Sequence, residues 1–174
     1  KRLGVKLKGY DYDKKFIFSE AGYNFEPSEI GASFGLEQIK KLKKFIVIRN
    51  QNFSMLLNFF NKQDMYFITP KIDKNVSSNF LAYPIILKEN KLFNRKKLQI
   101  YLEKNKIQTR PIFSGNILRH PGFENLISSR NKLNSFKNSD YIMRNGLLIG
   151  CHQGLKKNDI FRIISVVKNF LHKI

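Results

Sequence analysis

The sequence of 174 residues lacks tryptophan, has one cysteine, and holds only 13 Asp and Glu against 32 Lys and Arg. The single cysteine, Cys151, excludes a disulfide framework and a cysteine-rich zinc site, and it favours a reducing compartment. No apolar run approaches the roughly 20 residues that span a bilayer, and the first residues show no signal-peptide pattern. We therefore expect a cytoplasmic protein with no membrane partner and no metal site.

Aromatic residues are plentiful, with 16 Phe and 7 Tyr, and hydrophobic residues make up 42% of the chain. This content excludes a disordered chain, because so much apolar surface can be buried on folding. The length is ample for one packed core and too short for two large domains.

The formal net charge of +19 invites a nucleic-acid hypothesis, because Lys and Arg neutralise phosphates. The excess consists of 24 Lys and only 8 Arg spread along the chain, together with 18 Asn. Lys, Asn, Ile and Phe all have AT-rich codons, whereas base readout and bidentate phosphate contacts favour Arg. A Lys-rich nucleic-acid-binding module is therefore the least favoured alternative.

Apolar residues recur at spacings of mostly three, four or seven from Ile30 to Phe60, and lysines at 40, 41, 43 and 44 face the other way. This pattern predicts one long amphipathic helix that begins near Pro27, a residue well placed in a first helical turn. A helix of this length needs a large partner surface.

The remaining segments predict a small α/β layer. We expect no regular element in 1–15, a strand or extended loop at 16–25, a strand at 80–87 whose Pro84 favours a sheet edge, a helix at 93–105, a strand at 107–112, a Gly/Pro-punctuated loop at 113–123, helical turns at 138–145, a strand at 147–149 and a closing helix that ends near Leu171.

Several polar residues could carry chemistry. Asn24 can cap the helix that follows it or point toward an anionic ligand at the helix N-terminus. Arg110, before Pro111, can form a surface ion pair or bind a carboxylate or phosphate. His152 lies between two glycines at a strand end, which is more typical of an exposed histidine than of a core one.

The loop 113–123 gathers further polar donors, Asn116 and Arg119 among them, over few residues. No complete catalytic set is visible, because the sequence contains no P-loop, GxSxG, HExxH or CxxC motif. From the residues alone, the sequence predicts a small α/β domain with a cationic, ligand-facing set of loops.

The run GYNFEPSEIGASFGLEQ at 22–38 resembles a characteristic stretch of the DegT/DnrJ/StrS nucleotide-sugar aminotransferases. Segments after it keep the order and spacing of that family over essentially the whole chain, including IQTR at 107–110. The stretches TRPIFSGNILRHP at 109–121 and GCHQGL at 150–155 are most similar to the branch of lipopolysaccharide CDP-4-keto-6-deoxyglucose 3-dehydratases.

This resemblance implies an α/β fold, the C-terminal portion of a type I PLP-dependent transferase. Residues 1–62 would form the end of the large domain with the long linking helix, and residues 63–174 the small C-terminal domain. The cofactor would be pyridoxal or pyridoxamine 5'-phosphate. The Lys or His that faces it would lie upstream of Lys1, so the catalytic residues are unknown and this chain would be inactive alone.

The resemblance also implies residue roles and partners. Asn24 matches an asparagine that binds the cofactor phosphate across a homodimer with a shared active site. Arg110, Asn116, Arg119 and His152 lie in segments that line the substrate entrance, where the substrate is a nucleotide-diphosphate sugar. An amino donor such as glutamate would serve an aminotransferase, and an iron-sulfur reductase would serve a dehydratase.

The function expected from the resemblance is amino transfer or C3 dehydration of nucleotide-linked 4-keto-6-deoxy sugars for lipopolysaccharide and O-antigen deoxysugar biosynthesis. A non-catalytic fragment that still dimerises through the long helix is the second hypothesis.

Overall fold

The computed structural model describes residues 5–7, 10–12, 23, 25, 27–126 and 135–174. The chain divides into two units, Lys1–Lys40 and Lys41–Ile174. This division does not test the expected boundary at 62/63, which remains a prediction. None of the described helices is long and apolar enough to cross a membrane.

In the first unit, strands β1 (Val5–Leu7) and β2 (Tyr10–Tyr12) pair in an antiparallel manner. The sequence predicts no regular element there, so this pairing is a difference; each strand has only three residues, too few for a periodic signal. The strand or extended loop expected at 16–25 lies almost wholly outside the described residues.

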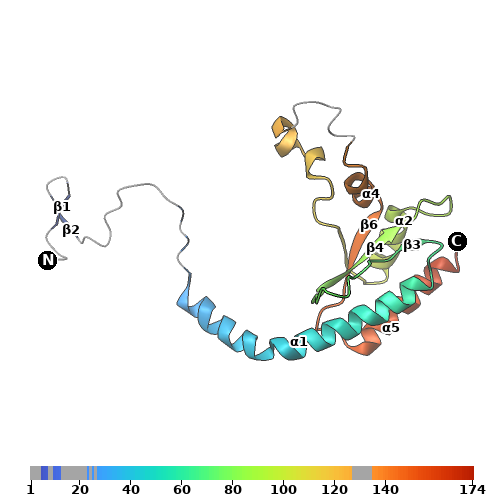
Figure 1. Ribbon diagram of the computed structural model, residues 1–174, viewed down its shortest axis with the longest axis horizontal. Helices are drawn as coiled ribbons and strands as arrows, with labels where there is room; N and C mark the ends of the chain where they lie inside the picture. Colours follow the sequence, from blue (N-terminus) through green and yellow to red (C-terminus); the bar gives the residue numbers. More distant parts are fainter. Residues whose placement is uncertain (1–4, 8–9, 13–22, 24, 26, 127–134) are drawn as a thin grey trace. The chain divides into compact units, whose positions relative to one another are not determined.

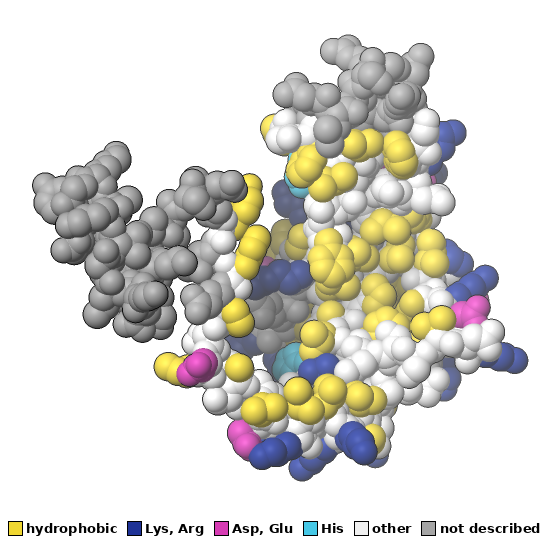
Figure 2. Space-filling model, turned by 60° about the vertical axis from the view of Figure 1, so that its left-hand side comes forward, with side chains coloured by type: hydrophobic (Ala, Val, Ile, Leu, Met, Phe, Trp, Pro, Cys, Tyr) yellow, Lys and Arg dark blue, Asp and Glu magenta, His cyan; other side chains and the backbone are white. Residues whose placement is uncertain are grey.

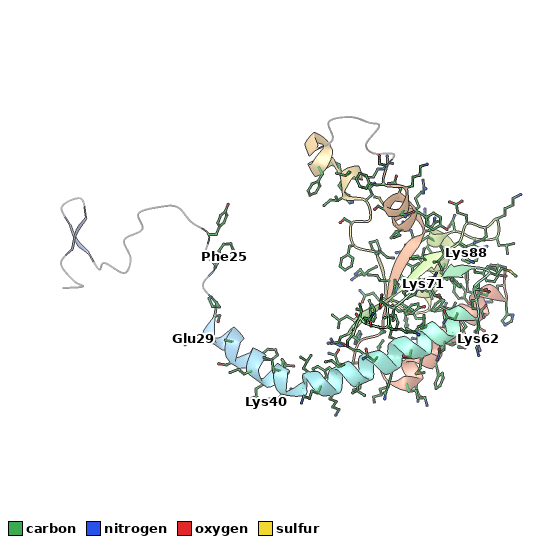
Figure 3. All side chains as sticks on the ribbon, in the orientation of Figure 1. Phe25, Glu29, Lys40, Lys62, Lys71 and Lys88 are labelled. Atoms are coloured by element: carbon green, nitrogen blue, oxygen red, sulfur yellow. The ribbon has the colours of Figure 1, made fainter. Side chains whose placement is uncertain are left out.

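The long helix is confirmed as α1 (Glu29–Asn61), which Figure 3 marks from Glu29 past Lys40 to its end near Lys62. Glu29 in the first turn suits the positive end of the helix dipole. Within residues 29–40 the large apolar side chains, such as Ile30 and Phe34, are exposed. The later residues of the helix, Phe53, Leu56 and Phe60 among them, are buried.

The second unit contains a four-stranded antiparallel sheet in the order β3-β4-β6-β5. Its strands are β3 (Phe67–Ile68), β4 (Ala82–Leu87), β5 (Thr109–Pro111) and β6 (Gly146–Gly150). Side chains alternate along β4, so Tyr83, Ile85 and Leu87 are buried while Ala82, Pro84 and Ile86 are partly exposed.

The core lies between the buried side of this sheet and three helices: α1, α2 (Arg95–Lys104) and α5 (Lys157–Leu171). Figure 1 shows α1 and α5 below the sheet. Phe60 of α1 stacks on Tyr83 with ring centroids 5.1 Å apart, and Phe93 meets Phe170 of α5 edge to face at 5.1 Å.

Short elements complete the unit. The segment after β5 contains the 3₁₀ turns η2 (Ile117–Arg119) and η3 (Pro121–Leu126), and α4 (Lys137–Asn145) precedes β6. The hydroxyl of Tyr141 on α4 donates to the Leu87 carbonyl at 2.9 Å, which attaches α4 to the end of β4.

The expectation that Pro84 favours an edge strand is wrong for the sheet as a whole, because β4 pairs with both β3 and β6. The physical reason is local. β3 has two residues and pairs only with Ile86 and Leu87. At Pro84, the edge of β4 that faces β3 therefore has no hydrogen-bonded partner strand among the described residues. A residue without an N–H is tolerated there.

Candidate functional site

A pocket of about 420 Å³ lies at the β5 edge of the sheet and extends to the first turns of α5. We call it the cationic pocket. Three cations against one carboxylate make it favourable to an anion. Its polar side chains are Lys106, Gln108, Arg110, His152, Asp159 and Arg162.

The one carboxylate of this pocket has a structural partner. Asp159 accepts the backbone N–H of Lys156 at 2.8 Å, which satisfies the N-cap backbone donor of α5. The three cations come from separate places in the chain, namely the end of α2, β5 and α5. Their convergence therefore depends on the fold.

Lys106 follows α2 in a left-handed conformation, with φ of 58°. Its N–H donates to the Glu103 carbonyl at 2.9 Å, and the N–H of Ile107 donates to the Leu102 carbonyl at 3.0 Å, which is a Schellman-type helix end. Glycine usually occupies this position. A lysine therefore stands at the pocket where the backbone geometry disfavours a side chain.

Arg110 is exposed on β5, opposite Leu148 of β6, and its guanidinium donates to the Thr109 carbonyl at 3.2 Å. The neighbouring Thr109 is buried, and its hydroxyl donates to Glu103 at 2.5 Å. This hydrogen bond is the main cause that lowers the pKa of Glu103. The strand is thus anchored through Thr109, while Arg110 faces the pocket.

Arg162 of α5 donates to the backbone carbonyl of Asn105, which joins α5 to the segment that follows α2. This contact holds one wall of the pocket against the other. The sequence did not indicate Arg162, since an arginine on the polar side of a helix carries no distinguishing signal.

His152 is exposed in the loop 151–155, and its imidazole lies between two glycines. A Cβ on Gly150 would be 3.3 Å from the ring Cδ2, and a Cβ on Gly154 would be 3.0 Å from Nδ1. The N–H of Gly154 donates to Nδ1 at 3.1 Å. Because a backbone N–H is always a donor, Nδ1 accepts, and the neutral ring carries its proton on Nε2.

Asn116 and Arg119 do not line the cationic pocket, and both donate to Asp140 on α4. The Asn116 amide donates to Oδ1 at 2.8 Å, and Arg119 donates to Oδ1 at 2.9 Å and to Oδ2 at 2.5 Å. The Arg119 guanidinium, then the Asn116 amide, hold the pKa of Asp140 at about 2. The side chain of Asn116 is buried, whereas that of Arg119 is 40% exposed.

The loop that carries Asn116 has a tight backbone. Phe113 and Gly115 are both left-handed, with φ of 47° and 61°, and a Cβ on Gly115 would lie 2.6 Å from the Cβ of Met143. Only glycine fits at 115. Phe113 is 86% exposed on this backbone.

Asn24, the residue predicted to bind a cofactor phosphate, lies outside the described residues. Of the other predicted site residues, Arg110 and His152 both line the cationic pocket. Asn116 and Arg119 lie in a separate cluster around Asp140. No group of three or more potential metal ligands occurs among the residues that could be described.

A larger groove of about 960 Å³ lies between the middle of α1 and the loop 151–155, and none of the predicted site residues lines it. Its lining side chains are uncharged, both apolar and polar, except for the lysines at 156 and 157. The loop separates the two hollows, since His152 lines the cationic pocket and Gln153 lines the groove. Four charged side chains line the cationic pocket, whereas two line the groove.

Besides Arg162, sequence reasoning missed two residues that hold these segments, Asn52 and Asp140. Asn52 lies four positions before Leu56 in the apolar stripe of α1, so an amide in an apolar stripe was an available signal. Asp140 is one of only 13 acidic residues, but nothing nearby in sequence links it to 116 or 119.

Figure 2 shows hydrophobic side chains gathered across one face of the molecule, with Lys and Arg mainly along its margins. In the second unit the exposed large hydrophobics include Leu81, Phe113 and Ile117. Exposed apolar surface of this kind is typical of an interaction face.

Comparison with known proteins gives consistent matches. The chain is 30% identical to the lipopolysaccharide biosynthesis protein RfbH of Salmonella typhimurium over 97% of its length, and 32% identical to GDP-4-keto-6-deoxy-D-mannose 3-dehydratase of Escherichia coli O55:H7 over 88%. It spans 38% of each of these relatives.

A solved structure of the E. coli GDP-4-keto-6-deoxy-D-mannose 3-dehydratase with bound hydrated PLP is similar to the chain, with a TM-score of 0.68 at 30% identity. The match covers 87% of this chain and 38% of the other. The fold is therefore the expected portion of a PLP-dependent aminotransferase fold. The DegT/DnrJ/EryC1/StrS aminotransferase family matches residues 3–168, and the chain belongs to that family.

Proposed function

We propose that this chain forms the C-terminal part of a PLP- or PMP-dependent enzyme that acts on nucleotide-linked 4-keto-6-deoxy sugars. The observation that carries the proposal is the convergence of Lys106, Arg110, Arg162 and His152 on one pocket. A nucleotide-diphosphate sugar is dianionic, and guanidinium and ammonium groups make charge-assisted hydrogen bonds to such phosphates. The biological setting proposed is deoxysugar synthesis for lipopolysaccharide and O-antigen.

Removal of the C3 hydroxyl is the reaction we favour over amino transfer. Support comes from the relatives, since three of those found carry the name of a 3-dehydratase, including a dTDP-4-dehydro-2,6-dideoxy-D-glucose 3-dehydratase of Saccharopolyspora spinosa. The reductase partner would then be an iron-sulfur protein. An amino donor such as glutamate would be needed for amino transfer.

The cofactor, when bound, supplies an electron sink for proton removal next to the sugar carbonyl carbon. The donors of the cationic pocket suit a phosphorylated ligand, and the chain's own contribution to the cofactor is proposed to be the Asn24 amide. Arg110 and His152 Nε2–H would orient the substrate. Asn116 and Arg119 are proposed as further substrate-side donors, and the half-exposed guanidinium of Arg119 leaves room for a ligand.

We propose a homodimer with a shared active site, in which residues 1–62 belong with the large domain and 63–174 form the small domain. The exposed apolar side chains of α1 support a partner surface. A cytoplasmic location is supported by the free, buried Cys151. The chain alone is proposed to be inactive.

A chimera tests the function most directly. The matching C-terminal part of the E. coli GDP-4-keto-6-deoxy-D-mannose 3-dehydratase is replaced by this chain, and the product formed from GDP-4-keto-6-deoxymannose is examined by mass spectrometry. We expect loss of the C3 hydroxyl, which would show that this chain completes the active site formed by the E. coli part. A folded chimera that binds PLP without converting the substrate would contradict the proposal.

Nucleotide binding tests the pocket itself. Calorimetric titration of the chimera with GDP, CDP and dTDP should show an affinity that falls at least about tenfold in Arg110→Leu, as expected for loss of a charge-assisted contact. Arg95→Leu, on α2 outside the pocket, is the matched control. Equal affinity in both variants would remove Arg110 from the site.

A further inference from the structure

The loop 151–155 is held against α1 by one buried amide. Asn52 is 4% exposed, and its Nδ2 donates to three backbone carbonyls: Cys151 at 3.4 Å, His152 at 3.2 Å and Leu155 at 3.1 Å. Such an amide group has two protons, so the three carbonyls share them. Both ends of the loop are thereby tied to the same point of the helix.

A second contact from the same helix strengthens this attachment. The guanidinium Nε of Arg49 donates to the side-chain oxygen of Gln153 at 2.7 Å. Arg49 and Asn52 are three positions apart, so they lie on one face of α1. The loop therefore presents Gln153 to the helix and leaves His152 on the opposite side, in the cationic pocket.

The orientation of the loop backbone determines which ring nitrogen of His152 carries the proton. With three carbonyls turned toward Asn52, the N–H of Gly154 is available to the ring and donates to Nδ1 at 3.1 Å. The two flanking glycines leave the space that the ring occupies. Nδ1 is thus occupied as an acceptor, and the only ring N–H left for a ligand is on Nε2.

We propose that Asn52 is a positioning residue for His152: by holding the loop 151–155 it keeps the imidazole as the Nε2–H tautomer, aimed as a donor into the cationic pocket. This rests on the proposed function only in taking that pocket as the substrate site. Asn52 acts through the loop and does not line the cationic pocket. The ligand recognised by the donor is an oxyanion or a carbonyl of the nucleotide sugar.

Nitrogen-15 NMR of the imidazoles in the 174-residue chain tests this, because protonated and unprotonated ring nitrogens resonate in different ranges. We expect His152 to show the Nε2–H tautomer in the wild type and a mixture of tautomers in Asn52→Leu, with amide exchange at Gly154 rising about tenfold. His120 and His172 are internal references, and Asn58→Leu, at an exposed position of the same helix, is the matched control.

Asn52→Ser keeps one hydroxyl donor in a smaller side chain, and it provides the test if Asn52→Leu does not fold. It should give an intermediate tautomer ratio. An unchanged His152 tautomer in a variant whose circular dichroism is native would overturn the proposal. The measurement needs no substrate, so its failure leaves the proposed function standing, whereas absent nucleotide binding would contradict the proposed function alone.

Discussion

At the scale of single residues, the two ring nitrogens of His152 differ: Nδ1 accepts the N–H of Gly154, and Nε2–H is directed to the cationic pocket. Substitutions that replace only one of these nitrogens should therefore have different effects on nucleotide affinity. The side-chain amide of Gln places its nitrogen near the position of Nε2, whereas that of Asn reaches only to the position of Nδ1. We expect His152→Gln to retain nucleotide affinity within about threefold and His152→Asn to lose about tenfold or more, because a hydrogen bond to a charged group contributes about 1.5–3 kcal/mol.

Calorimetric titration of the chimera with a nucleoside diphosphate checks this difference. His120→Asn is the control, since the ring of His120 interacts with the Ser114 carbonyl at 2.8 Å and does not line the cationic pocket. Equal losses in the Gln and Asn variants would show that His152 acts without its Nε2–H donor.

The thiol of Cys151 should be inert although it is adjacent to His152. Cys151 is fully buried and its Sγ lies 3.4 Å from the Phe80 carbonyl, and burial raises its pKa to about 12. At pH 8 only about one thiol in ten thousand is then ionised, and the thiolate is the reactive form. We expect no labelling by a thiol-reactive dye in the native chain and full labelling in guanidinium chloride.

The labelling reports on Cys151 alone, because the chain has no other cysteine. Rapid labelling of the native chain would mean that the core opens at the β6 end, and it would place the loop 151–155 among the least stable parts of the molecule.

At the scale of elements, Asp140 joins α4 to the segment of η2, and its ionisation should control that link. The pKa of Asp140 is held at about 2 by Arg119 and then Asn116, below the value near 4 expected when unfolded. A group with a lowered folded pKa stabilises the fold above its unfolded pKa. The stabilisation is therefore fully present above about pH 4 and is lost as the pH falls toward 2.

We expect Asp140→Asn to lower the melting temperature at pH 7, and the difference from the wild type to shrink between about pH 4 and pH 2. Thermal melts across this range measure it. Asp64→Asn, at an exposed residue with no ion pair in the described part of the chain, is the control. A difference that stays constant down to pH 2 would contradict the role of the ionised carboxylate.

How far the sequence predicts these elements depends on their length and on local signals. The spacing of apolar residues such as Phe53, Leu56 and Phe60 predicts α1, because the helical period recurs many times in a helix of 33 residues. β3 has two residues and no period, so it was missed. The position of Pro84 depended on where β3 ends, which no local pattern encodes.

The site residues are likewise predictable only where a local sequence signal marks them. Arg110 and His152 stand beside proline and glycines, and such punctuation is visible in the sequence. Lys106 and Arg162 reach the same pocket only through the packing of α2 and α5. Asp140 lies 24 and 21 positions from its partners Asn116 and Arg119, and pairing over that distance is set by the tertiary fold.

At the scale of the whole molecule, the chain has a buried core in its second unit and exposed apolar side chains in its first. The formal net charge of +19 opposes non-specific association through such apolar side chains. We therefore expect the exposed apolar side chains of α1 to be covered by the partner subunit in the proposed homodimer.

Ile30 and Phe34 are four positions apart on α1, so they share a face, and they are 84% and 68% exposed. We expect the chain to self-associate in sedimentation velocity and Phe34→Lys to weaken the dimer by at least about tenfold. The reason is that burying a phenylalanine contributes about 1.5–3 kcal/mol, which a lysine at the interface does not recover.

Ser33→Lys is the matched control, because it introduces the same side chain one position away, on the polar stripe with Glu37 and Lys40. It should leave the sedimentation coefficient unchanged. If the wild-type chain sediments as a strict monomer at all concentrations, the stripe is not covered by a second copy of this chain, and the shared active site loses its support. If both variants dissociate equally, added charge and not the loss of the Phe34 ring is the cause.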